Sequence, residues 1–119
     1  MVRGIRGAVQ AVDNTSEAIH GATTELICAL LAANRVQTHD IASVFLTSTP
    51  DLDADFPAYA VRQMSGWQQV PLLGAQELKV PGAMPRVIRV LLHVNTGMEA
   101  NEIRHVYLGE TKKLRPDLA

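Results

Sequence analysis

The sequence predicts an α+β fold, in which a mixed β-sheet of about five strands carries two main helices on one face. The first observation is the order of the patterns along the chain, which runs strand, helix, strand, helix and then three strands. The second is a core built from Val, Leu, Ile and Ala, because 47% of the residues are hydrophobic but only 4% are aromatic. The third is the stretch "RVIRVLLHV" over residues 86–94, which is apolar on both alternating faces and is typical of a strand covered on both sides.

The amino-terminal elements are a strand and a long helix. Residues 2–12 have β-type character, and Gly4 and Gly7 within them indicate a bulge or the close approach of another backbone or ligand. Residues 13–35 predict the helix, because Asn14 or Thr15 can cap it and apolar residues recur at helical spacing. These recurring residues are Ile19, Ala22, Thr23, Leu26, Ile27 and Leu30. Glu17 lies near the positive end of the helix dipole.

The later elements are shorter and are separated by turn-forming residues. They are, in order, a strand over 43–49, a helix over 57–64 with Pro57 in its first turn, a strand over 70–78, a turn over 79–85, the longest strand over 86–96 and a short strand over 104–108. At 119 residues the chain fits one domain, spanning 1–119. Its strands offer more apolar surface than two helices can bury, so we expect the second face of the sheet to pack against other copies of the chain.

Charge and composition exclude several functions. The net charge is -1, from 11 basic and 12 acidic residues with no long basic run, so we do not expect a nucleic-acid partner. No phosphate-binding glycine loop, nucleophile elbow or metal-ligand spacing of the four histidines is present, and His20 is typical of a helix surface. The single cysteine, Cys28, is interpreted as a packing residue rather than a nucleophile, and it excludes an internal disulfide. We see no targeting or membrane-spanning segment and expect a cytoplasmic protein.

Arg89 is the residue that the fold alone does not explain. It lies in the middle of the longest predicted strand, where a desolvated guanidinium without a partner costs several kcal/mol. Its partner could be an internal carboxylate or an anionic ligand, and its side chain could also reach solvent at a sheet edge. Arg6, Arg62 and Arg115 are similarly placed, with Glu77 near the end of a strand. Several guanidinium groups around one cavity would suit a small di-acid.

Short motifs spread over almost the whole chain resemble the AroH class of chorismate mutase. They are "RGIRGA" (3–8), "TPDLDADFPAYAVRQMSGWQQVPLL" (49–73), "QEL" (76–78), "IRVLLHVNT" (88–96), "IRHVYL" (103–108) and "LRPDL" (114–118). The resemblance implies a homotrimer whose sheets pack into a barrel-like core, with active sites in the clefts between neighbouring subunits. It also implies that chorismate rearranges to prephenate, on the route to phenylalanine and tyrosine, by a concerted [3,3] shift that needs no metal or cofactor.

The resemblance also implies roles for individual residues. Arg89 would face the ether oxygen of the substrate, Glu77 the ring hydroxyl, and Arg6 and Tyr107 a substrate carboxylate. The remaining implied contacts to substrate are Phe56, Ala58, Arg62, Leu73, Gly74, Leu114 and Arg115. Two positions depart from the family: Gly74 replaces a Cys or Ser and offers only its backbone, and Tyr59 replaces a charged residue.

Two other interpretations stay open from the sequence. A trimeric binding module could hold a small carboxylate metabolite through Arg6 and Arg89 without converting it, although Glu77 would then have no task. In a purely structural interpretation the arginines pair with acids that the sequence clusters in one segment, namely Asp51, Asp53 and Asp55. An Arg89 side chain that points into open solvent, or is locked by a carboxylate of its own chain, would contradict the catalytic role.

Overall fold

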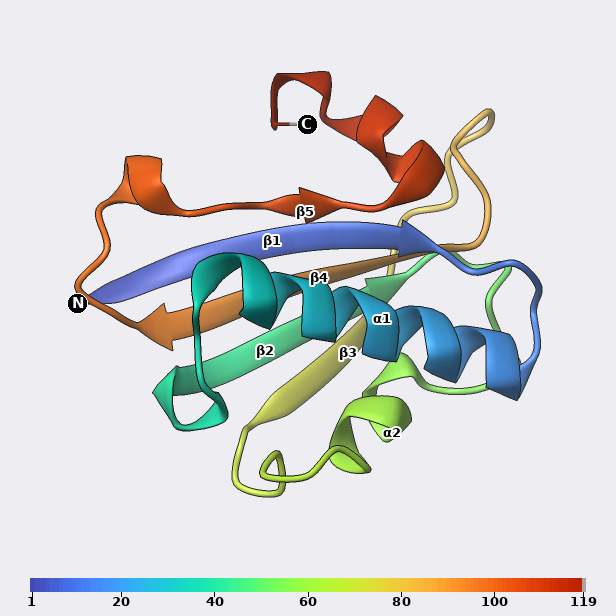
Figure 1. Ribbon diagram of the computed structural model, residues 1–119. Coiled ribbons are helices and arrows are strands. Elements are labelled where there is room, and N and C mark those ends of the chain that lie inside the picture. Colours follow the sequence, from blue (N-terminus) through green and yellow to red (C-terminus); the bar gives the residue numbers. More distant parts are fainter. Residues whose placement is uncertain (119) are drawn as a thin grey trace.

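The computed structural model describes residues 1–118 and contains a five-stranded sheet in the order β3-β2-β4-β1-β5 (Figure 1). The strands are β1 (Val2–Gln10), β2 (Ile41–Ser48), β3 (Leu72–Gln76), β4 (Val87–Asn95) and β5 (Val106–Tyr107). The three central strands pair antiparallel, whereas β5 lies parallel to β1 and β3 lies parallel to β2. The mixed sheet confirms the predicted α+β fold.

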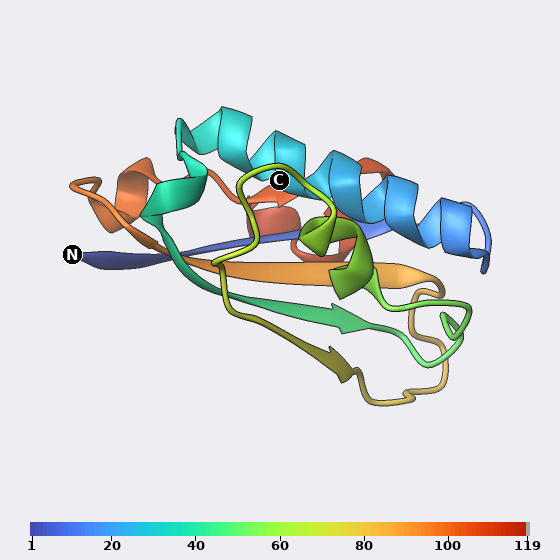
Figure 2. The ribbon, with the colours of Figure 1, turned by 90° about the horizontal axis from the view of Figure 1, so that it is seen from below.

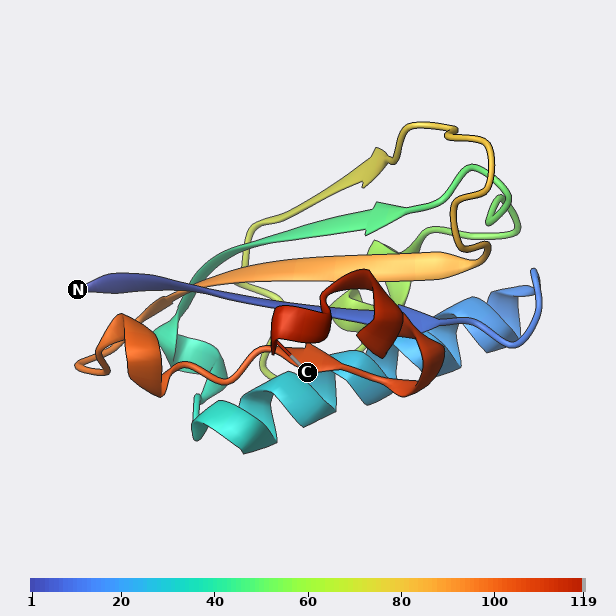
Figure 3. The same ribbon diagram turned by 90° about the horizontal axis from the view of Figure 1, so that it is seen from above.

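Both helices, α1 (Ser16–Asn34) and α2 (Pro57–Arg62), lie on one face of the sheet, as the two edge-on views show (Figures 2 and 3). Thr15 caps α1, because its hydroxyl oxygen accepts a hydrogen bond from the Ala18 amide at 3.1 Å. Pro57 occupies the first turn of α2, as its fixed φ and missing amide hydrogen favour. The chain also contains short 3₁₀ helices at Thr38–Asp40, Ala100–Glu102, Gly109–Leu114 and Pro116–Leu118. Among residues 1–118, no helix is long and apolar enough to cross a membrane.

The structure corrects the extent of several predicted elements and the position of Cys28. The predicted strand over 70–78 is confined to Leu72–Gln76, and the last strand to Val106–Tyr107. The second helix ends at Arg62, two residues before the predicted end. Cys28 is exposed rather than packed, because its neighbours Leu26, Ile27 and Leu30 belong to the buried face of α1 and Cys28 does not.

The two faces of the sheet differ in burial. Under the helices, β4 contributes Ile88, Val90, Leu92 and Val94, none of which is more than 2% exposed. The face away from the helices, called the open face below, carries Phe45, Leu73 and Leu91, which are 43%, 60% and 36% exposed. The side chains of β4 thus alternate between the two faces, as the pleat of a strand requires. A single chain therefore covers one face and leaves large apolar groups on the other.

Gly7 is required where β5 joins the sheet. A Cβ added there would lie 2.5 Å from the Val106 carbonyl oxygen and 3.0 Å from a methyl carbon of Leu26. We therefore expect Gly7→Ala to destabilise the protein by about 1–3 kcal/mol, because the parallel β1–β5 contact must open to admit the methyl group. Chemical denaturation followed by circular dichroism would measure the change.

Gly21 provides a matched control for Gly7. It lies inside α1, and nothing comes within 4 Å of an added Cβ. Gly21→Ala should stabilise the protein by up to about 1 kcal/mol through helix propensity alone. Equal effects at both glycines would contradict the close approach at Gly7.

Candidate active site

The sheet register aligns a row of open-face side chains across all five strands. Tyr107 of β5 is opposite Ala8 of β1, which is opposite Arg89 of β4, and Arg89 is opposite Thr47 of β2. Thr47 is in turn opposite Ala75 of β3, two residues before Glu77. Arg6 lies on the same face, one row farther along β1. Four site residues that were predicted from distant parts of the sequence thus share the open face, namely Arg6, Glu77, Arg89 and Tyr107.

Arg89, Glu77 and Thr47 form a connected polar group in this row. Arg89 Nε donates to both carboxylate oxygens of Glu77, at 3.2 Å to Oε1 and 3.1 Å to Oε2. The Thr47 hydroxyl donates to Oε2 at 2.7 Å. The Glu77 amide also bonds to the Ser48 carbonyl at 2.9 Å, which extends the β2–β3 ladder and holds the carboxylate over the sheet. Glu77 and Arg89 side chains are 18% and 41% exposed.

Arg89 is therefore bound by a carboxylate of its own chain, and a contact that occupied the whole guanidinium would contradict a catalytic role. The engagement uses Nε only: within residues 1–118, neither Nη atom of Arg89 has a hydrogen-bond partner. The outer end of the guanidinium keeps its donors for a ligand. Glu77 thus orients the Arg89 guanidinium through Nε and leaves its Nη donors for a ligand, which is consistent with Arg89 as a site residue.

The purely structural interpretation named the wrong acids. Asp51 accepts from the Arg86 amide at 2.9 Å, Asp53 accepts from the Asn14 side chain at 2.7 Å, and Asp55 lies 2.9 Å from His20 Nε2. These contacts anchor the loop between β2 and α2, and none of the three acids pairs with Arg6 or Arg89 in the part of the chain that the structure describes.

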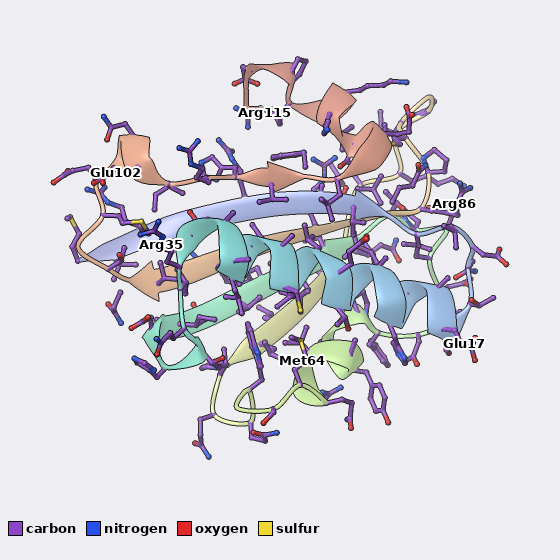
Figure 4. All side chains as sticks on the ribbon, in the orientation of Figure 1. Glu17, Arg35, Met64, Arg86, Glu102 and Arg115 are labelled. Atoms are coloured by element: carbon purple, nitrogen blue, oxygen red, sulfur yellow. The ribbon has the colours of Figure 1, made fainter. Side chains whose placement is uncertain are left out.

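Arg6 and the carboxyl-terminal segment form the other end of the group. The Arg6 side-chain Nε is buried and has no hydrogen-bond partner among the described residues. Leu114 packs against the cluster of Ala8, Val87 and Tyr107, and the next residue, Arg115, lies on the segment beyond β5 (Figure 4). Arg115 donates to both carboxylate oxygens of Asp117, at 3.1 and 2.8 Å. A buried guanidinium nitrogen without a partner is costly, and an anionic ligand would satisfy it.

A cleft of about 750 Å³ lies on the helix side of the sheet, between α2, its preceding loop and β3. Four predicted site residues line this cleft together with the buried Trp67, namely Phe56, Ala58, Arg62 and Gly74. Leu73, also predicted, is on the open face instead, since its neighbour Gly74 is opposite Leu46 on the helix side. One chain therefore divides the predicted residues between two sides of its sheet.

The two positions that depart from the family have different surroundings. A Cβ added at Gly74 would meet only the Leu46 carbonyl oxygen, at an ordinary 3.7 Å, so the fold has room for a side chain there. Tyr59 stacks on His20 of α1, with ring centroids 5.2 Å apart, and lies outside the lining of the cleft. Tyr59 therefore contributes to the α1–α2 contact rather than to the cleft wall.

His105 is a further residue of this group, which the sequence interpretation missed. Its Nδ1 accepts a hydrogen bond from the Arg6 amide at 3.1 Å, so this nitrogen carries no proton. Burial, together with the charges of Arg6 and Arg115, lowers the pKa of His105 below its ordinary value of 6.5. The stability that depends on neutral His105 is fully present above about pH 6.5 and is lost as the pH falls from there through the folded pKa.

We therefore expect the free energy of unfolding to fall between pH 7.5 and pH 5.5, and His105→Gln to remove part of that fall, because an amide oxygen accepts the Arg6 N–H without titrating. Urea denaturation at both pH values would test this. His39→Gln is the control for the same histidine-to-glutamine change, since the exposed His39 side chain contacts Asp40 and leaves the Arg6–His105 hydrogen bond intact; the part of the fall that depends on His105 should remain in it. An unchanged fall in His105→Gln would contradict the assignment.

Comparison with known proteins agrees with this arrangement. The sequence pattern of the "chorismate mutase type I" family matches residues 2–118. The chain is 53% identical to chorismate mutase AroH of Thermus thermophilus, over 99% of this chain and 97% of the relative, and 44% identical to chorismate mutase AroH of Bacillus subtilis, over 100% and 94%. The solved structure of a chorismate mutase from Clostridium thermocellum superposes with a TM-score of 0.90 at 41% identity, covering 93% of this chain and 98% of that one. The fold, the residues on its two sheet faces and these similarities lead to one conclusion: the chain belongs to the type I chorismate mutase family.

Proposed function

We propose that this protein is a chorismate mutase, an isomerase that converts chorismate to prephenate by a concerted [3,3] rearrangement. Family membership over residues 2–118 supports the activity. The observation that carries the mechanism is the Arg89 guanidinium on the open face, held through Nε by Glu77 with both Nη groups left for a ligand. The protein's task is to hold the compact conformer of the substrate and to stabilise the charge that develops as its ether bond breaks.

Arg89 acts on the transition state in this proposal. Negative charge accumulates on the ether oxygen only as the C–O bond breaks, so a fixed guanidinium gains interaction energy along the reaction coordinate. Arg6 and Tyr107 instead hold a carboxylate that is charged throughout, and Arg6 should therefore affect binding more than turnover. Glu77 meets the ring hydroxyl, an acceptor role that a carboxylate with a free lone pair can fill.

Two protomers build each site in this proposal. The open face of one subunit supplies Arg6, Glu77, Arg89 and Tyr107, and the cleft of its neighbour supplies Phe56, Ala58 and Arg62 in a homotrimer. The exposed apolar groups of the open face support such packing, and so does the 73% exposure of Phe56 at the cleft. Leu73, Gly74, Leu114 and Arg115 complete the proposed substrate contacts. We further propose that residues 1–119 form one catalytic domain in the cytoplasm.

The activity has a direct test. Purified protein, without added cofactor, should accelerate the loss of the diene absorbance of chorismate. Binding of chorismate without any loss of absorbance would instead support the non-catalytic binding module. A monomer by light scattering at micromolar concentration would contradict the trimer.

Complementation between two variants tests whether the site is shared. Arg89→Ala removes the open-face cation, and Gly74→Phe fills the cleft at a position with room for a side chain. Each homotrimer should be inactive. Refolding the two together should restore roughly a quarter of wild-type activity, because random mixing pairs an intact face with an intact cleft at that frequency. A mixture as inactive as its parents would show that each site lies within one chain.

A further inference from the structure

We propose that Thr47 is a positioning residue, which holds the Glu77 carboxylate away from the outer end of the Arg89 guanidinium and leaves one of its oxygens for the substrate. This inference rests on the proposed function, because it deepens the roles given to Arg89 and Glu77. It concerns a side chain to which neither the sequence motifs nor the family resemblance assigned a task.

The register places Thr47 between the two charged groups. Thr47 is opposite Arg89 on β4 and opposite Ala75 on β3, so its hydroxyl lies on the open face between the two strands. Strands β3 and β4 do not pair with each other, because β2 separates them. Glu77 must therefore reach across β2 to meet Arg89, and Thr47 is the β2 residue in its path. The hydroxyl makes its bond to Glu77 Oε2 at 2.7 Å.

The hydrogen bonds distinguish the two carboxylate oxygens. Oε2 accepts from both the Thr47 hydroxyl, at 2.7 Å, and Arg89 Nε, at 3.1 Å. Oε1 accepts only from Arg89 Nε, at 3.2 Å, among residues 1–118. An ionised carboxylate oxygen can accept more than one hydrogen bond. Oε1 can therefore still accept a hydrogen bond from a ligand hydroxyl. The Thr47 bond to Oε2 determines that Oε1, and not Oε2, is the oxygen available to the ligand.

The same bond protects the donors of Arg89. A glutamate side chain has several rotatable bonds, and the preferred arrangement of a guanidinium with a carboxylate is a fork of two parallel hydrogen bonds. Without the hydroxyl, Glu77 is free to slide toward an Nη group of Arg89 and form that fork. The internal pair would then occupy a donor that the substrate oxygen needs. Thr47 prevents this by holding Oε2 over β2.

Thr47→Val tests the proposal, because valine keeps the β-branched shape and removes only the hydroxyl. We expect kcat for chorismate to fall roughly tenfold with a smaller change in KM, since a hydrogen bond to a charged group is lost. Thr47→Ser should recover most of that loss. In a Glu77→Ala background, Thr47→Val should lower kcat by less than about twofold, because no carboxylate remains to be held. An undiminished loss in that background would overturn the proposal, as would unchanged kcat in Thr47→Val.

A second measurement does not depend on activity. Melting temperatures of the two single variants and the double variant should be non-additive, since both changes remove the same hydrogen bond. Additive melting shifts would overturn the Thr47–Glu77 contact. A wild-type protein that leaves chorismate unconverted would defeat the proposed function, and the thermal cycle would still decide whether Thr47 holds Glu77.

Discussion

Replacing Arg89 by Ala should lower kcat for chorismate by at least a hundred- to a thousandfold, the loss typical when one preorganised donor to a developing oxyanion is removed. The substitution also leaves Glu77 without its cationic partner, so a carboxylate remains on the open face where the substrate oxygen becomes negative. Both effects act on the transition state, and kcat should therefore fall more than KM rises. Arg89→Lys should recover only part of the activity, because an ammonium group cannot contact Glu77 and the substrate through separate arms of a planar fork.

Steady-state kinetics with circular dichroism as a check of folding would measure this effect. Arg104→Ala is the matched control, because Arg104 is exposed and only its backbone, which bonds to Asn34, is engaged in the described structure. That variant should turn over chorismate at the wild-type rate. Near-normal turnover in Arg89→Ala would refute the role of Arg89.

Glu77→Ala should lower kcat/KM by roughly a hundredfold or more, since it removes the acceptor for a substrate hydroxyl and frees the Arg89 side chain that it orients. Glu77→Gln should be partly active. Its amide oxygen can accept from Arg89 Nε, and its amide nitrogen can donate to the Thr47 hydroxyl, which reverses its own role to acceptor. The geometry is then kept while the charge is lost.

The same assay separates geometry from charge at position 77. Activity in Glu77→Gln well above that of Glu77→Ala would show that hydrogen-bond geometry dominates, and equal loss in both would show that the charge does. Wild-type activity in Glu77→Ala would remove Glu77 from the site.

Local patterns in the sequence predicted the elements that local interactions determine. Thr15 caps α1 because a threonine before a helical apolar pattern supplies the missing acceptor, and the period-two alternation of β4 separates Arg89 from the buried row of Ile88 and Val90. The long and strongly periodic segments were therefore predicted well. The two-residue strand β5 was predicted too long, because only the contact with β1 at Gly7 and Ala8 makes it a strand.

The missed site residues depend on register, which a single sequence does not contain. Thr47 is 42 residues before Arg89 in the chain and becomes its neighbour only through the β2–β4 pairing. His105 reaches the Arg6 amide because β5 lies parallel to β1. The predicted partner acids were wrong for the same reason: Asp51 follows β2 and Glu77 follows β3, and only the pairing of the strands shows which acid lies near Arg89. Hydrophobic pattern determines which face a residue takes but not its neighbour across the strands.

The sheet order has a consequence for how the enzyme responds to heat. The long antiparallel strands form the middle of the sheet, whereas its two edges are short parallel strands: β3, which precedes Glu77, and β5, which contains Tyr107. Edge strands open locally at a lower free energy than the central strands of a sheet. Warming should therefore lower the catalytic rate while the central strands are still folded. Activity would then be lost at a lower temperature than the one at which the circular-dichroism signal begins to change.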